Sequence, residues 1–150
     1  MSCDILPTES DISGRHYRCN VLPLLRKRWD LVIAHPPCTY IATAGGHYLR
    51  DNLGHYARKL PLETGEVRRR LMREASNFFR RILEARSPRI AVENPVPLRC
   101  AVEIIGRSYD QRFRTGQFGE ERDKEICLWL SGLPPLVPTH VVDRDDLFLP

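Results

Sequence analysis

Two short stretches of the chain are nearly continuous apolar runs of strand length. The first is DLVIAH at residues 30–35, and the second is RIAV at 89–92. Unbroken apolar residues, without alternating polar ones, are typical of strands that are covered on both faces, as in a parallel sheet. We therefore predict two buried strands at these positions.

The segment between these runs has the periodicity of a helix. From about Thr64 to Arg86, apolar residues recur at steps of three and four and leave arginines on the other side; they are Val67, Leu71, Ala75, Phe78, Phe79, Ile82 and Leu83. This pattern predicts an amphipathic helix, which Ser87 and Pro88 end. A strand, a helix and a second strand of these lengths form a βαβ unit, in which the two strands run parallel.

The remaining pattern predicts shorter elements. We expect brief strands in SCDIL (2–6) and HYRCNVL (16–22), a short helix near 23–28, and another helix near 98–105 that stops at Gly106. YDQRFRTGQF (109–118) and KEICLWL (124–130) predict a pair of strands joined across a charged turn. Residues 39–60, with three glycines, favour a long irregular loop. The expected fold class is α/β.

Composition limits the domain organisation and the function classes. With 150 residues and 42% hydrophobic content, the chain suits one domain over 1–150. A net charge of +4 permits a polyanionic partner without requiring one. Residues 58–89 hold ten Lys or Arg against four Glu, which indicates one basic side, either a nucleic-acid contact or a solvated helix face.

The cysteines and the hydropathy pattern indicate where the protein works. Five widely spaced cysteines without a CxxC pair or a secretory signal favour a reduced, cytoplasmic setting. No apolar run approaches the roughly 20 residues that cross a bilayer, so we expect no membrane span. The spacing of His35, His47 and His55 fits no standard zinc pattern, and we expect no metal.

Three polar residues follow the ends of the two predicted strands. Cys38 comes after the first strand, and Glu93 with Asn94 ends the second. Functional groups collect at the carboxyl ends of parallel strands, so we expect these side chains to share a crevice. A thiolate there can attack an electron-poor carbon while the carboxyl group protonates a ring nitrogen and the amide holds the carboxyl group. The plainer interpretations are a packed cysteine and a turn cap.

These motifs resemble those of DNA cytosine-5 methyltransferases. The Pro-Cys and Glu-Asn dipeptides of that family match Pro37-Cys38 and Glu93-Asn94, and the wider pattern over 3–140 is similar to small methyltransferase-like proteins of bacteriophages. The resemblance implies a three-layer, mostly parallel sheet of Rossmann-like type. It also implies that Cys38 adds to C6 of a flipped-out cytosine, that Glu93 contacts N3, and that C5 takes a methyl group from S-adenosylmethionine.

The resemblance also suggests binding residues. Asp4 stands where an acidic residue would hold the ribose of S-adenosylmethionine, and Asn20 stands where a side chain would contact the adenine; Pro36 and Pro37 complete the candidate donor-binding set. Arg112 and Arg114 lie in QRFR, which loosely matches a later motif of the family, and Tyr40 could stack on a base or simply cover the core. These three are the candidate substrate-binding residues, with DNA or a pyrimidine nucleotide as the partner.

The chain departs from the family at its N-terminal side. The family's first strand and glycine-rich donor-binding turn have no counterpart, so we expect an N-terminally truncated sheet with a gap or two exposed edges. Such a sheet would re-pair, form a homo-oligomer or take a strand from a partner chain. Two alternatives therefore stay open: a pyrimidine-modifying enzyme with another donor, and a catalytically degenerate phage accessory or anti-defence protein that binds a nucleotide or a partner.

Overall fold

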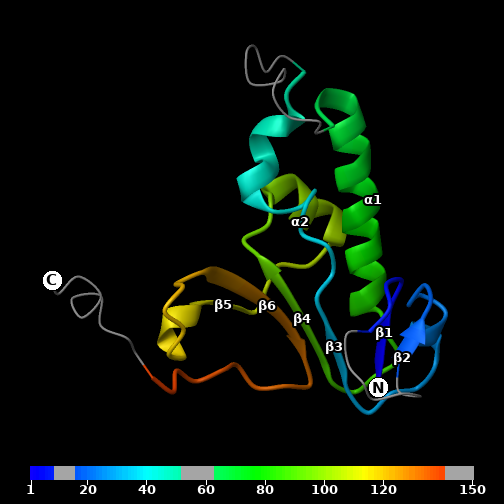
Figure 1. Ribbon diagram of the computed structural model, residues 1–150, viewed down its shortest axis with the longest axis vertical. Helices are drawn as coiled ribbons and strands as arrows, with labels where there is room; N and C mark the ends of the chain where they lie inside the picture. Colours follow the sequence, from blue (N-terminus) through cyan, green and yellow to red (C-terminus); the bar gives the residue numbers. More distant parts are fainter. Residues whose placement is uncertain (9–15, 52–62, 141–150) are drawn as a thin grey trace, which may run out of the picture.

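The computed structural model describes residues 1–8, 16–51 and 63–140, which form a mixed α/β structure with two small sheets (Figure 1). The helices are α1 (Gly65–Leu83) and α2 (Arg99–Ile105), with 3-10 turns η1 (Leu24–Arg26), η2 (Thr43–Leu49) and η4 (Thr115–Gln117). The strands are β1 (Ser2–Asp4), β2 (His16–Arg18), β3 (Val32–Ala34), β4 (Ile90–Pro95), β5 (Gln111–Arg114) and β6 (Glu125–Ser131). None of the helices in these ranges is long and apolar enough to span a bilayer.

The predicted βαβ unit is confirmed. β3 and β4 pair in parallel, with Val32 beside Ile90 and Ala34 beside Val92, and α1 connects them. The other half of the sheet corrects the expectation of a mostly parallel arrangement. Its strand order is β3-β4-β6-β5, and β6 runs antiparallel to both neighbours. β6 returns from β5 through a short connection, which permits antiparallel pairing; a parallel pair would need a longer crossover.

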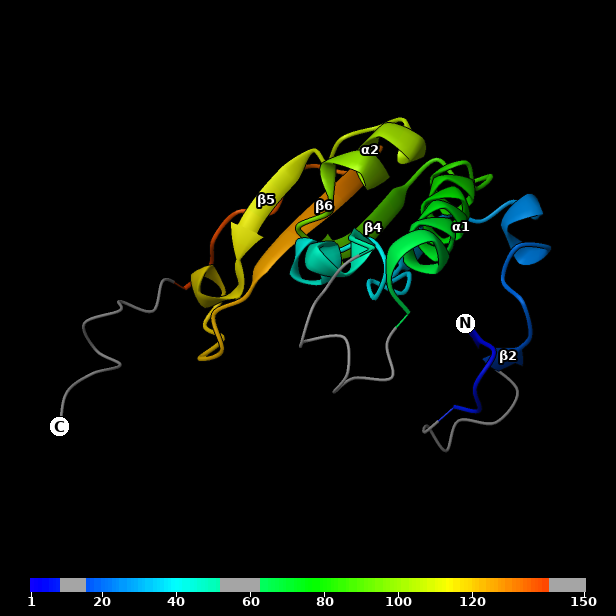
Figure 2. The same ribbon diagram turned by 90° about the horizontal axis from the view of Figure 1, so that it is seen from above.

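The core lies between the sheet and the two helices. α1 and α2 pack together on one face of the sheet (Figure 2). Phe79 of α1 meets Trp129 of β6 edge to face with ring centroids 4.7 Å apart, and both side chains are fully buried. Val92 and Cys127 complete the same buried layer. Alternate residues of β4 face this core, which explains why Asn94 is buried while Glu93 points the other way.

The opposite face of the sheet is more open at β3. Ile33 is 65% exposed and Leu31 is 45% exposed, so the expectation that DLVIAH is covered on both faces was wrong. In Figure 2, α1 and α2 both lie on one side of the four-stranded sheet. The described part of the chain therefore shows helices on one face of the sheet only.

Helix α1 differs from its sequence pattern at its first turns. Val67 is 45% exposed, whereas Arg68 is 2% exposed and takes the inward position. The guanidinium group of Arg68 stacks over the rings of Tyr40 and Tyr48 and donates to the Thr39 carbonyl. Here the helix packs against η2, whose 3-10 turns replace part of the irregular loop expected at 39–60. Residues 52–60 of that loop lie outside the described residues.

The N-terminal strands form a separate sheet. β1 pairs with β2 in parallel, with Cys3 beside Tyr17, and neither strand pairs with β3. The β1–β2 pair stands apart from the four-stranded sheet in both views (Figures 1 and 2). A cleft of about 680 Å³ separates the two sheets. The break that the sequence led us to expect between the N-terminal strands and DLVIAH is therefore present.

Candidate functional site

The chain after β3 makes a tight turn at Cys38. The Cys38 carbonyl accepts hydrogen bonds from the backbone N–H groups of Ile41 and Ala42, at 3.1 and 3.0 Å. The next residues are tied to the chain that follows β4, because Thr43 donates to the Val96 carbonyl at 2.9 Å. Ile41 is fully buried, so it anchors this turn in the core. The half-buried Cys38 thus sits on a turn that is held from both sides.

Asn94 connects the second strand to the same turn. Its Nδ2 donates to the Pro36 carbonyl at 2.8 Å, and its side chain is 1% exposed. Its Oδ1 is buried and has no hydrogen-bond partner among the described residues. Asn94 therefore fixes the backbone two residues before Cys38. From the sequence we expected this amide to hold the carboxyl group of Glu93, whereas in the structure it donates to the Pro36 carbonyl.

Cys38, Glu93 and Asn94 line one cleft of about 610 Å³. The cleft lies at the carboxyl ends of β3 and β4, where the sequence predicted that these three residues would meet. His35, Pro36 and Pro37 also line it, and Lys124, Glu125 and Ile126 enter from the start of β6. The antiparallel β6 pairs with β4 so that Pro95 lies beside Ile126, which brings this second group of residues to the same edge.

His35 and Lys124 line the cleft although no sequence motif pointed to them. His35 Nδ1 lies 2.9 Å from Glu93 Oε2, and the Glu93 side chain is 27% exposed. The imidazole can therefore exchange a proton with the Glu93 carboxylate within one hydrogen bond. Lys124 adds a cation to the cleft. The position of His35 directly before Pro36 could have indicated its contact with Glu93. The position of Lys124 in the cleft follows only from the pairing of β4 with β6.

The two arginines of QRFR are engaged in ion pairs outside the lining of this cleft. Arg112 Nη2 lies 2.5 Å from Glu125 Oε1, and Arg114 donates to Asp123 Oδ2 at 2.6 Å. Hydrogen bonding to Glu125 raises the pKa of Arg112 above its ordinary value. Glu125 itself lines the cleft, so Arg112 reaches the candidate site through that carboxylate.

Tyr40 lies beside the cleft and not in its lining. Its ring centroid is 4.6 Å from the guanidinium carbon of Arg68, and its hydroxyl donates to Glu63 Oε2 at 3.4 Å. The ring packs against the core. In this arrangement the Tyr40 ring lies against the guanidinium group of Arg68, and its role in stacking on a base stays a prediction.

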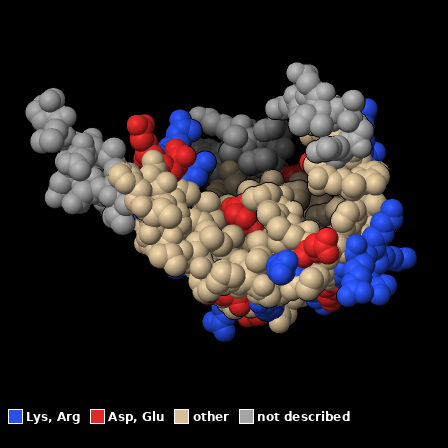
Figure 3. All heavy atoms as spheres, turned by 90° about the horizontal axis from the view of Figure 1, so that it is seen from below, with Lys and Arg blue, Asp and Glu red and all other residues tan. Residues whose placement is uncertain are grey.

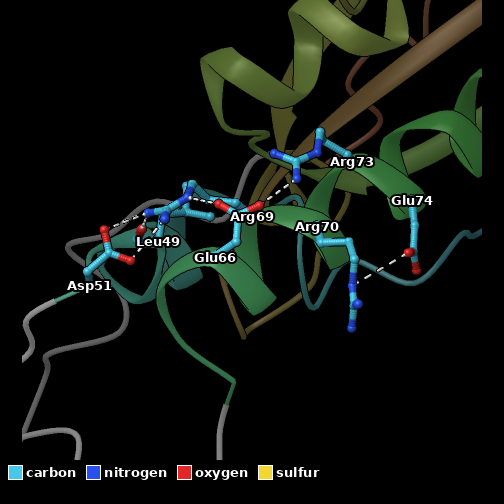
Figure 4. Close-up of polar contacts among 7 residues, drawn as sticks. All are labelled: Leu49, Asp51, Glu66, Arg69, Arg70, Arg73 and Glu74. Atoms are coloured by element: carbon cyan, nitrogen blue, oxygen red, sulfur yellow. Dashed lines mark hydrogen bonds and ion pairs between the residues drawn. The ribbon is translucent and has the colours of Figure 1, made fainter.

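Several arginines of α1 are paired with carboxylates (Figure 4). Arg69 bonds Asp51 and Glu66 at 2.9 and 3.0 Å, and Arg73 bonds Glu66 at 2.8 Å. Hydrogen bonds from Arg73 and then Arg69 lower the pKa of Glu66. Basic side chains also gather along one edge of the face in Figure 3, while acidic ones are scattered over it.

The four candidate donor-binding residues line the other cleft, the one between β1 and β3. Asp4 ends β1, Asn20 follows β2, and Pro36 and Pro37 come from the turn after β3. Asp4 Oδ1 and Asn20 Oδ1 each accept from the backbone N–H two residues on, at 2.9 Å. No glycine lines this cleft, so no close backbone cradle for S-adenosylmethionine is present in the described residues. The residues present therefore fit one side of a donor site only.

No group of three or more metal-ligating side chains occurs within 1–8, 16–51 and 63–140. Comparisons with protein-family models, curated proteins and solved structures found no match to this chain.

Proposed function

We propose that this chain is a cytosine-5 methyltransferase-like protein that activates a pyrimidine, with DNA or a pyrimidine nucleotide as its substrate. The observation that carries the proposal is the gathering of Cys38, Glu93 and Asn94 in one cleft at the carboxyl ends of two parallel strands. Groups that act together in catalysis cluster in crevices of this kind. In this proposal the four-stranded sheet is part of a Rossmann-like methyltransferase sheet.

Each residue has a defined part in the chemistry. The Cys38 thiolate attacks C6 of the pyrimidine and forms a carbon–sulfur bond, and the electron pair of the C5–C6 double bond moves toward C5 and the ring. Glu93 gives a proton to N3 and so neutralises the charge that develops there. His35 lies 2.9 Å from that carboxyl group and can return the proton to it. Asn94 acts indirectly, because it holds the turn that presents Cys38.

S-adenosylmethionine, where bound, would supply the methyl group for C5. The residues that would hold it are Asp4, Asn20, Pro36 and Pro37, which line one side of the N-terminal cleft. Because that cleft lacks a glycine cradle in the described residues, the proposal is limited to activation of the pyrimidine, and methyl transfer requires a completed donor site.

A hydrogen-exchange experiment tests the activation without any donor. Reversible attack at C6 makes C5 basic, so deuterium from heavy water replaces the C5 hydrogen of cytosine. We expect this exchange, followed by mass spectrometry, with at least one of three substrates: single-stranded DNA, duplex DNA and deoxycytidine monophosphate. Cys38→Ala should abolish it, and Glu93→Gln should slow it by roughly 10²–10⁴-fold. Cys100→Ala, at another half-buried cysteine, is the matched control and should exchange normally.

Two other results would change the proposal. Absence of exchange with all three substrates, together with saturable binding of one of them, would support the degenerate binding protein and contradict the catalytic assignment. Exchange that depends on Cys38, without binding of S-adenosylmethionine by calorimetry, would support a pyrimidine-modifying enzyme with another donor.

A further inference from the structure

The cleft between the two sheets is bordered by two strand edges that have no partner in the described part of the chain. Residues of β1 (Ser2–Asp4) line one side, and residues of β3 (Val32–Ala34) line the other. Within the described ranges, β1 pairs only with β2, and β3 pairs only with β4. The cleft is therefore more than a gap between packed surfaces, because backbone hydrogen-bonding groups face it from both sides.

The hydrogen bonds show which backbone groups face the cleft. The N–H of Val32 donates to the Arg89 carbonyl on the β4 side, at 2.9 Å. Neighbouring residues of a strand point their N–H and C=O groups to opposite edges, so those of Ile33 point away from β4. By the same alternation, the Asp4 carbonyl accepts from Cys19 on the β2 side, and the groups of Cys3 point away from β2.

The side chains around these edges are apolar on both faces of the sheet plane. Phe78 and Ile82 of α1 line the cleft from the side of the core, while Leu31 and Ile33 are exposed on the other face. An extended segment in the cleft would place alternate side chains on these two surfaces. The side chains that such a segment places on either surface must therefore be apolar.

The small number of charged side chains at the cleft limits which kind of segment can bind there. Among the described residues that line the cleft, Asp4 and His35 are the only Asp, Glu, Lys, Arg or His side chains. Asp4 is the last residue of β1, and His35 directly follows β3. A charged segment would be desolvated there without a compensating partner along most of its length. The chemistry thus favours an uncharged backbone with small or branched aliphatic side chains.

We propose that this cleft receives one short, uncharged β-strand from a separate polypeptide, which pairs with β3 on one side and β1 on the other. Main-chain hydrogen bonds to Ile33 and Cys3 supply the affinity, and the apolar side chains supply the selectivity. Because β1 and β3 each span three residues, three or four residues of the partner suffice. The inserted strand joins the two sheets into one. This inference does not rest on the proposed chemistry of Cys38.

A peptide probe tests the proposal on the whole chain. The probe is acetyl-Lys-Val-Ile-Val-Ala-Lys-amide, whose lysines keep it soluble at either end, and the readout is amide hydrogen exchange and NMR shifts of the protein. We expect saturable shifts at Ile33 and Cys3, and exchange at the Ile33 amide slowed by about tenfold or more. The same peptide with N-methyl groups on alternate amides should have no effect, because it cannot pair at both edges.

A protein variant isolates the edge of β3. Ile33→Pro removes the N–H that faces the cleft but leaves the Val32 bond to β4, so it should lose the peptide response. Ile33→Val keeps the N–H and should respond like the native chain. Absence of shifts with millimolar peptide, or equal shifts with the N-methylated peptide, would overturn the proposal. Protection of Ile33 in a self-associated form, seen by sedimentation without peptide, would also overturn it and assign the cleft to a second copy.

Discussion

Asn94 Nδ2 donates a 2.8 Å hydrogen bond to the Pro36 carbonyl, and this single contact joins β4 to the turn that carries Cys38. Both residues are buried, although they are 58 positions apart in the chain. A buried carbonyl that loses its donor stays desolvated and unpaired, so the bond is costly to break. The position of the candidate nucleophile therefore depends on a side chain of the neighbouring strand.

Replacing Asn94 with Ala should loosen this turn. We expect the free energy of unfolding to fall by about 1–3 kcal/mol, because the Pro36 carbonyl is left buried without a donor. Urea unfolding measures this change, and the alkylation rate of Cys38, read by peptide mass spectrometry, should change with it. Asn20→Ala, at an exposed amide that follows β2, is the control and should leave the Cys38 rate unchanged. An unchanged rate in Asn94→Ala would contradict the positioning role.

Cys127 should make the protein less stable at alkaline pH. Burial is the main cause that raises the pKa of its thiol from 9.0 to about 11. A raised folded-state pKa stabilises the folded protein below pH 9, and that stabilisation is lost as the pH rises from about 9 to about 11. The two-unit shift corresponds to roughly 3 kcal/mol. Urea unfolding at pH 8 and pH 11 should show a larger loss in the native chain than in Cys127→Ala; equal losses would refute this assignment.

Gly132 and Gly106 form a matched pair for backbone strain. Both have a left-handed φ, at +61° and +78°, which costs about 1–2 kcal/mol for an L-residue with a side chain. A Cβ at Gly132 would collide with the Pro88 carbonyl, whereas one at Gly106 would meet nothing within 4 Å. Thermal unfolding should therefore show Gly132→Ala clearly less stable than Gly106→Ala. Similar melting temperatures of the two variants would contradict this, and would mean that the chain after β6 can shift away from Pro88 at little cost.

Arg68 should tolerate loss of its charge better than loss of its volume. Its Nε and Nη1 are buried without hydrogen-bond partners among the described residues. Arg68→Met keeps most of the packing and removes the buried charge, so we expect stability equal to the native chain or higher by about 1–2 kcal/mol. Arg68→Ala should be destabilising, because it removes the buried stem as well as the guanidinium group that stacks over Tyr40 and Tyr48.

Arg70→Met is the matched control for Arg68. Arg70 is exposed and lies 3.9 Å from Glu74, so its replacement should change the free energy of unfolding by less than about 0.5 kcal/mol. Urea unfolding of the three variants makes the comparison. A loss of stability in Arg68→Met as large as that in Arg68→Ala would show that the charge itself, and not the stem, stabilises the fold.

The elements that rest on local pattern were predictable. The apolar runs predicted β3 and β4, and the three-four spacing predicted α1. Cys38 follows β3, and Glu93 and Asn94 lie near the end of β4, so the carboxyl ends of two parallel strands bring them to one cleft. Periodicity carries this information because a helix or strand buries one face at a fixed residue interval.

Other features depended on contacts between distant residues. Three such features are the burial of Arg68, the contact of His35 with Glu93 and the position of Lys124 in the cleft lining. They depend on how the elements pack, which the local spacing of residues does not predict. The sequence by itself determined β3, α1 and β4 and which residues stand at the ends of those two strands, but not the 3-10 turns of η2. Only the tertiary structure decided that β6 pairs antiparallel with β4, because strand pairing is a choice among distant edges whose backbone groups are chemically alike.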